Sequence, residues 1–308
     1  CSPYDEYGSL LKILDNVNGV KVGNPLYNAT LNTKFAESYL DFTDNIYIEY
    51  QMIKALKLVG RFSISSKKTE MEDFYPADHT KFLETGWEGE DAMIRKGSYE
   101  MTNGNQTSYS GDISAQFNHS FSKSHDLFAT AQFTISETKY DEVSHNAEGF
   151  PNSRMNSIIH ARQYALDSKP TGYDGINRNL GLLLTAGYSY KDKYMLTATF
   201  RSDASSVFSA KNKWGFFPSF SAAWNLAKEP WLEHVNEISM FKVRAGWGTV
   251  GNDRITTNLS MNLYTDEKYG VGTEPTIVLT PKQIANYDLK WEGSTTTNIG
   301  LDLGFFDS

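Results

Sequence analysis

Residues 126–136 read DLFATAQFTIS, a run in which apolar and polar side chains alternate. One face of this run carries Leu127, Ala129, Ala131, Phe133 and Ile135. The other face carries hydroxyl and amide side chains together with Phe128. Because successive side chains of a β-strand point to opposite sides, the run predicts a strand with one apolar and one polar surface.

The same alternation returns about nine times along the chain, which predicts an all-β protein. The predicted strands cover residues 44–53, 56–65, 109–121, 126–136, 179–190, 194–201, 216–226, 240–249 and 296–305. Short turns alternate with long polar connections at about 66–108, 139–177 and 251–295. Transmembrane barrels join their strands in this way, with short periplasmic turns and long outer loops. The pattern therefore favours an antiparallel transmembrane β-barrel segment over a soluble β-sandwich or propeller, which stays the alternative.

The number of predicted strands indicates that this chain does not close a barrel by itself. Residues 1–43 are rich in turn formers, so we expect them to form an extracellular loop region, with a partial barrel over 44–308. Single-chain bacterial barrels use even numbers of strands, and an open sheet in lipid leaves backbone groups unsatisfied at both edges. About nine strands would therefore be an arc of a larger barrel. Within the second long connection, residues 152–167 have helix-like spacing.

Composition excludes several classes of protein. The net charge of −8 opposes nonspecific binding to nucleic acid, which requires a basic face. The sequence contains no run of eighteen apolar residues, so it predicts no transmembrane helix. A transmembrane barrel would show no such run, because its strands carry apolar residues only at alternate positions. The single cysteine, Cys1, excludes a disulfide framework. Cys1 could be the lipidated start of a lipoprotein, or position 1 could be an internal boundary of a longer chain.

Motifs for catalysis or cofactor binding are weak. Residues 246–251 match GxGxxG, but neither a helical pattern nor a βαβ alternation follows them. The six histidines show no HxxxH spacing, and no GxSxG motif occurs. We therefore expect no metal, no cofactor and no enzyme activity. An outer-membrane barrel enzyme with acidic or histidine residues on its loops is the alternative.

Several segments carry a resemblance to a known family. They are residues 201–224 (RSDASSVFSAKNKWGFFPSFSAAW), 241–253 (FKVRAGWGTVGND), 286–292 (NYDLKWE) and 297–306 (TNIGLDLGFF). Residues 24–27 and 53–62 also fit. In this order and spacing, they resemble the SusC/RagA family of TonB-dependent outer-membrane transporters of Bacteroidetes. The resemblance covers nearly the whole chain and identifies it as the middle-to-late part of the barrel of such a transporter.

The resemblance implies a barrel of about 22 strands. It also implies an N-terminal plug, a SusD-like surface lipoprotein as a lid, and import of oligosaccharides or peptides with energy from TonB. We expect the plug and the TonB-interacting region to lie outside this chain, and the chain to lie in the bacterial outer membrane against lipid.

Aromatic rings beside hydrogen-bonding groups suit sugar rings or peptides. The loop residues expected to contact substrate are Trp87, Tyr99, Phe150, Arg154 and Tyr173. For each aromatic residue among them, packing of the loops against one another is the alternative. The cations expected to line the lumen are Arg61, Arg201 and Arg244, on the polar faces of their strands.

Overall fold

The computed structural model describes residues 2–83, 87, 89–166, 168–232, 234–235, 237–255, 259–269 and 276–306. The chain forms two compact units. The first, called the loop unit, comprises Cys1–Thr43, Ser65–Thr107 and Lys139–Ile176. The second, called the barrel unit, comprises Asp44–Ile64, Ser108–Thr138 and Asn177–Ser308.

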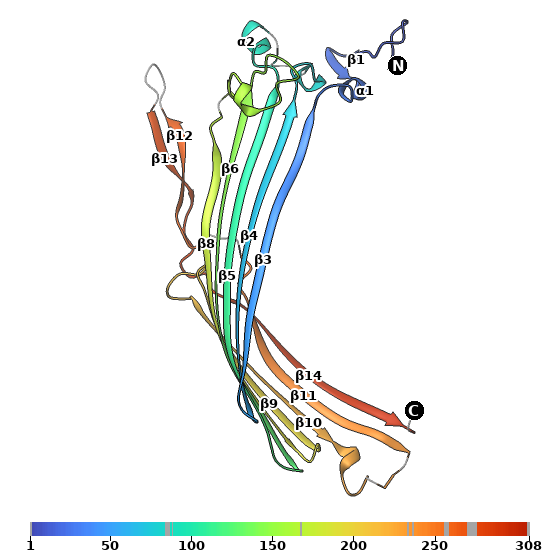
Figure 1. Cartoon of the computed structure of the whole chain (residues 1–308), viewed down its shortest axis with the longest axis vertical. Helices are drawn as coiled ribbons and strands as arrows, with labels where there is room; N and C mark the ends of the chain where they lie inside the picture. The colour runs from blue at the N-terminus through green and yellow to red at the C-terminus, as the bar shows by residue number, and fades with distance from the viewer. Residues whose placement is uncertain are drawn as a thin grey trace. The chain divides into compact units, whose positions relative to one another are not determined.

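One sheet holds the strands that the alternation predicts (Figure 1). Within the described residues, its hydrogen-bonded order is β14-β11-β10-β9-β8-β6-β5-β4-β3. The strands are β3 (Lys34–Ile53), β4 (Leu56–Tyr75), β5 (Ser98–Ser122), β6 (His125–Glu148), β8 (Thr171–Tyr190), β9 (Tyr194–Ser205), β10 (Trp214–Asn225), β11 (Ile238–Asn252) and β14 (Glu292–Phe305). A further short strand, β7 (Gln163–Tyr164), pairs with β6 off this path. The predicted barrel segment of about nine strands is confirmed.

Tight turns at one end set the register of neighbouring strands. Between β8 and β9, Tyr190 pairs with Tyr194, and the amide of Lys193 donates a hydrogen bond to the carbonyl of Tyr190 at 2.9 Å. Lys191 and Asp192 both have positive φ, at 52° and 53°. Two successive residues of positive φ make the type I′ turn, whose twist matches that of the flanking strands.

The apolar face of the barrel unit is exposed. Leu184 on β8 is 43% exposed, Leu196 on β9 is 57% exposed, and Ile299 on β14 is 82% exposed. In a β-sandwich these side chains would be buried against a second sheet. Within the described residues, the buried aromatic cluster is Phe74, Tyr99 and Phe150, which belongs to the loop unit. The apolar face is therefore available to lipid.

The long connections are shorter than predicted. β4 continues to Tyr75 and β5 begins at Ser98, so strand extends into much of the range 66–108. Likewise, β6 continues to Glu148 and β8 begins at Thr171, inside the range 139–177. These extensions carry polar residues on both faces, as in residues 66–73 (SKKTEMED), so they lack the alternation by which a half-apolar strand is recognised.

Other ranges predicted as loop also contain regular structure. Before β3 lie the hairpin of β1 (Ile13–Val17) and β2 (Val20–Gly23) and the short helix α1 (Pro25–Asn28). Asn24 caps α1, since its side-chain oxygen accepts a hydrogen bond from the amide of Leu26. Within 251–295, β12 (Leu263–Tyr269) pairs with β13 (Thr276–Gln283).

Helices are few and short in the part of the chain that the structure describes. The helix-like spacing over 152–167 was misleading, because this range contains the 3₁₀ turn η2 (Ile158–His160) and β7. The other helical elements are α2 (Glu90–Met93), η1 (Thr80–Leu83) and η3 (Leu226–Lys228). No described helix has the length and apolarity needed to cross a membrane.

Candidate functional site

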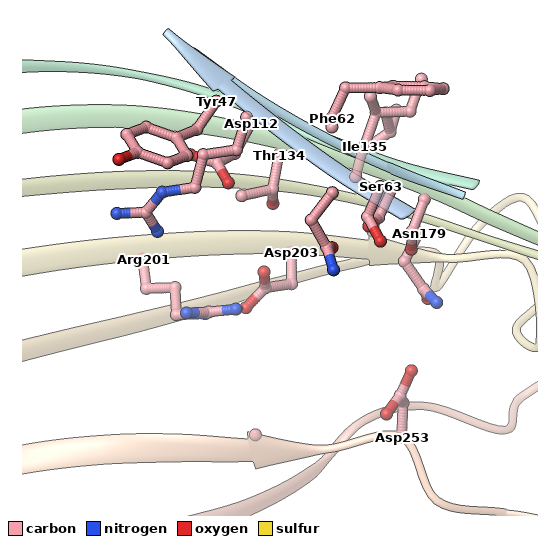
Figure 2. A pocket seen from close by; sticks show the side chains of 18 of the residues that line it. Tyr47, Phe62, Ser63, Asp112, Thr134, Ile135, Asn179, Arg201, Asp203 and Asp253 are labelled. Atoms are coloured by element: carbon pink, nitrogen blue, oxygen red, sulfur yellow. The ribbon is translucent and has the colours of Figure 1, made fainter. Parts of the chain in front are cut away.

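A groove of ≈ 880 Å³ runs along the polar face of the barrel unit (Figure 2). We call it the polar groove. Its polar and charged lining includes Asn45, Tyr47, Arg61, Asp112, Thr134, Asn179, Arg201, Asp203 and Asp253. These residues come from β3, β4, β5, β6, β8 and β9 and from the connection after β11, so the sheet brings together residues far apart in sequence.

A glycine allows two lining side chains to approach the backbone of β8. Gly181 pairs with Asp203 across β8 and β9. A Cβ on Gly181 would lie 2.5 Å from Oγ1 of Thr134 and 2.8 Å from Oδ1 of Asp203. A Cβ there would force the side chain of Thr134 or Asp203 to move, so the glycine leaves room for this close approach.

Charges of both signs face the polar groove. The Nε of Arg201 donates a hydrogen bond to Oδ2 of Asp203 at 2.6 Å, along β9. Asp253 lies on the other side of the groove from this pair (Figure 2). Asp112 has one carboxylate oxygen, Oδ2, that is shielded from solvent and has no hydrogen-bond partner among the described residues. Such a group is costly unless a partner satisfies it.

The structure places two of the three predicted lumen cations in the polar groove. Arg61 and Arg201 line it. Arg244 lies on β11 outside that lining, with Nη2 at 3.2 Å from Oδ1 of Asp302 on β14. A Cβ on Gly300 would lie 2.6 Å from Nε of Arg244, so this glycine leaves room for the side chain. Contact of these cations with a substrate stays a prediction.

Tyr99 and Phe150, predicted as loop contacts, pack together in the loop unit. Tyr99 is 1% exposed and Phe150 is 3% exposed, and both rings contact Phe74. The centroids of the Tyr99 and Phe150 rings are 6.0 Å apart in a stacked arrangement. The hydroxyl of Tyr99 donates a hydrogen bond to Glu72. This geometry fits the packing alternative, and substrate contact by these two residues stays a prediction.

The other three loop candidates have separate surroundings. Trp87 is half-buried, with its ring centroid 4.8 Å from that of Phe82 and 5.3 Å from the guanidinium of Arg95. Arg154 is exposed. Tyr173 is exposed and lies on β8, where its hydroxyl donates a hydrogen bond to Oε2 of Glu142 at 3.2 Å. Substrate contact by these three residues also stays a prediction.

Two acidic residues of the polar groove, Asp203 and Asp253, were not singled out from the sequence. Asp203 lies two residues after Arg201, so both side chains share one face of β9. That parity could have identified Asp203. The proximity of Asp253 and Asp112 to this pair depends on strand order and register, which a single sequence does not specify.

A half-buried carboxylate in the loop unit, that of Glu72, predicts a pH dependence. Hydrogen bonds from Lys34 and then from Tyr99 hold the pKa of Glu72 below its ordinary value of about 4.5. A lowered folded-state pKa contributes stability above the unfolded-state value, and this stability is lost as pH falls through the folded-state value. We expect hydroxyl-radical labelling of Tyr99 to rise as pH falls below about 4.5.

Two variants test that assignment. Glu72→Gln should reduce the pH dependence of Tyr99 labelling, because its amide does not titrate. Glu70→Gln is the matched control, since Glu70 is exposed on the same strand and should leave the dependence unchanged. Equal curves for the Glu72 variant and the parent would contradict the role given to Glu72.

The fold and the two unlike faces define one class of protein, a segment of a transmembrane β-barrel. The family model described as "TonB dependent receptor-like, beta-barrel" matches residues 4–308. The chain therefore belongs to the TonB-dependent receptor β-barrel family, whose members are named as receptors and not as a class of enzymes.

Relatives and solved structures agree with this family. TonB-dependent receptor P3 of Formosa agariphila is 29% identical over 295 residues, which cover 95% of this chain and 28% of that protein. TonB-dependent receptor SusC of Bacteroides thetaiotaomicron is 37% identical over 142 residues, which cover 44% of this chain and 14% of SusC. The chain spans less than a third of the length of either relative.

The structure of the RagAB peptide transporter matches with a TM-score of 0.81 and 20% identity, over 99% of this chain and 32% of that chain. At that identity, the match speaks for the fold. The resemblance predicted from the sequence motifs is confirmed.

Proposed function

We propose that this chain is the middle-to-late barrel of an outer-membrane transporter that imports oligosaccharides or peptides with energy from TonB. The observation that carries the proposal is the contrast between the two faces of the barrel unit. One face exposes large apolar side chains such as Leu196 and Ile299, and the other carries the charged polar groove. Lipid satisfies the first face, and a water-filled lumen satisfies the second.

The strand extensions of the loop unit lack this contrast, and that difference supports one orientation of the chain. The strand extensions in the loop unit, such as residues 66–73, are polar on both faces and suit water on both sides. We therefore assign the loop unit to the extracellular side and residues 1–43 to an extracellular region. A SusD-like surface lipoprotein would cover that side as a lid. TonB would act through a region outside this chain.

The proposal is tested with the full-length protein in its own bacterium. Deletion of the gene should abolish growth on at least one member of a panel of oligosaccharides and peptides supplied as sole nutrient. Restoring the gene should restore growth, and a protonophore should stop uptake of that nutrient. The full-length protein should also require detergent for extraction.

Two results would contradict the proposal. Recovery of the intact protein in the aqueous phase without detergent would remove the membrane assignment. Turnover of an oligosaccharide or peptide by the purified protein, without transport, would favour an outer-membrane enzyme. Co-purification of a surface lipoprotein with the tagged transporter tests the proposed lid separately.

A further inference from the structure

Three charged groups of the polar groove lack an ion-pair partner within the described part of the chain. They are Arg61, Asp112 and Asp253. Other charges on this face do pair, inside the groove and outside it. Lys57 lies four residues before Arg61 on β4 and pairs with Glu49 at 3.2 Å, and Arg201 pairs with Asp203. The polar groove thus presents one unpaired cation and two unpaired anions.

Arg61 and Asp112 lie on neighbouring strands, β4 and β5, yet they form no ion pair. Neighbouring strands are about 4.8 Å apart, so a direct pair would be within reach of a long arginine side chain. Oδ2 of Asp112 is shielded from solvent and lacks a hydrogen-bond partner among the described residues, so the carboxylate must rotate for this oxygen to meet a ligand. A charge that faces a groove without a partner in this chain is satisfied by water, by a ligand of opposite charge, or by a part of the full-length protein that lies outside this chain.

We propose that the polar groove holds a zwitterionic part of the imported solute, with its anionic group on Arg61 and its cationic group on Asp112 and Asp253. This inference rests on the proposed function and names the chemical class of its substrate. A guanidinium binds a carboxylate through two parallel hydrogen bonds, and a carboxylate binds an ammonium group through a charge-assisted bond. Tyr47, Thr134 and Asn179 add neutral hydrogen-bonding groups beside them.

Two kinds of solute carry this chemistry. One is a short peptide with a free ammonium group and a free carboxylate. The other is an oligosaccharide that carries both amino and carboxyl groups. A neutral oligosaccharide offers neither charge and would leave the unpaired groups of the groove solvated.

The test uses the purified full-length transporter in detergent and four probes. They are a mixture of tetrapeptides with free termini, the same mixture acetylated and amidated, a neutral oligosaccharide pool, and a pool carrying amino and carboxyl groups. Retained solutes are identified by mass spectrometry, and affinities are measured by calorimetry. We expect one zwitterionic probe to bind and its neutral counterpart to bind roughly 10- to 100-fold more weakly, as loss of a charged hydrogen bond implies.

Variants assign the two ends of the solute. Arg61→Gln should weaken binding of the zwitterionic probe roughly 10-fold or more and leave the neutral probe unchanged. Asp112→Asn should weaken binding of the same probe to a similar extent, because it removes the anion that holds the cationic group of the solute. Arg61→Lys should retain part of the affinity that Arg61→Gln loses. Lys57→Gln is the matched control, because Lys57 lies on the same strand and already has a partner in Glu49. Each variant is first checked for a folded barrel by its heat-dependent migration on gels.

Equal retention of the charged and neutral probes would overturn the inference. So would unchanged affinity of the zwitterionic probe in both Arg61→Gln and Asp112→Asn. Growth assays separate these failures from failure of the transport proposal. If the gene still supports protonophore-sensitive uptake of a neutral oligosaccharide, transport stands and only the zwitterionic class is wrong.

Discussion

Leu184→Arg is expected to destabilise the barrel by about 2–4 kcal/mol, while Thr185→Arg, at the next residue, is expected to cost less than about 1 kcal/mol. Leu184 lies on the exposed apolar face of β8, and Thr185 lies on the polar face. An arginine on the lipid face near the middle of a spanning strand must lose its hydration, whereas the lumen face is wet. Thr185→Arg removes only the hydrogen bond between its hydroxyl and that of Thr199, at 3.2 Å.

The measurement is the denaturant dependence of folding of the full-length protein into lipid vesicles, with heat-dependent migration on gels as a second readout. The two variants carry the same new side chain one residue apart, so local strand propensity is matched. Only the face differs. Similar losses of stability in both variants would contradict the assignment of lipid to one face and water to the other.

The strands within the barrel unit were predictable because one physical signal repeats there. In β8 and β9, residues such as Leu184 and Leu196 keep the same parity, and a membrane requires that parity on every strand. Turn chemistry was less visible, because Lys191 and Asp192 adopt positive φ without the glycine or asparagine that usually marks such a turn. Tertiary pairing of the strands overrides that local preference.

The loop unit was the part that sequence reasoning described least well. Its strand extensions carry polar residues on both faces, as in residues 66–73, so no apolar period marks them. Its buried aromatic residues, Tyr99 and Phe150, were grouped with exposed ones such as Tyr173, because the residue type alone does not indicate whether an aromatic side chain is buried. Of the polar groove, the sequence predicted the cations and missed an anion. Arg61 and Arg201 follow from strand parity, but Asp253 reaches the groove only through the order of strands in the sheet.

Phe150→Ala is expected to destabilise the loop unit by about 3–5 kcal/mol, the usual cost of deleting a buried phenylalanine ring. Phe150 is 3% exposed, and its ring contacts both Phe74 and Tyr99. It also joins two connections, because its amide donates a hydrogen bond to the carbonyl of Lys96 at 3.0 Å. Hydroxyl-radical labelling of Tyr99 and limited proteolysis of the loop unit should both increase, while heat-dependent migration of the barrel stays unchanged.

Ile159→Ala is the control for this variant, because Ile159 is 82% exposed in the same connection and should change neither readout. A further variant, Phe150→Leu, separates packing from substrate binding at Phe150. A purely structural role predicts that Phe150→Leu, which keeps an apolar side chain in the cluster, restores protection of Tyr99 and substrate affinity together. Restored protection with affinity still reduced would instead assign the ring of Phe150 to the substrate, because the cluster would then be packed and only the aromatic ring would be missing.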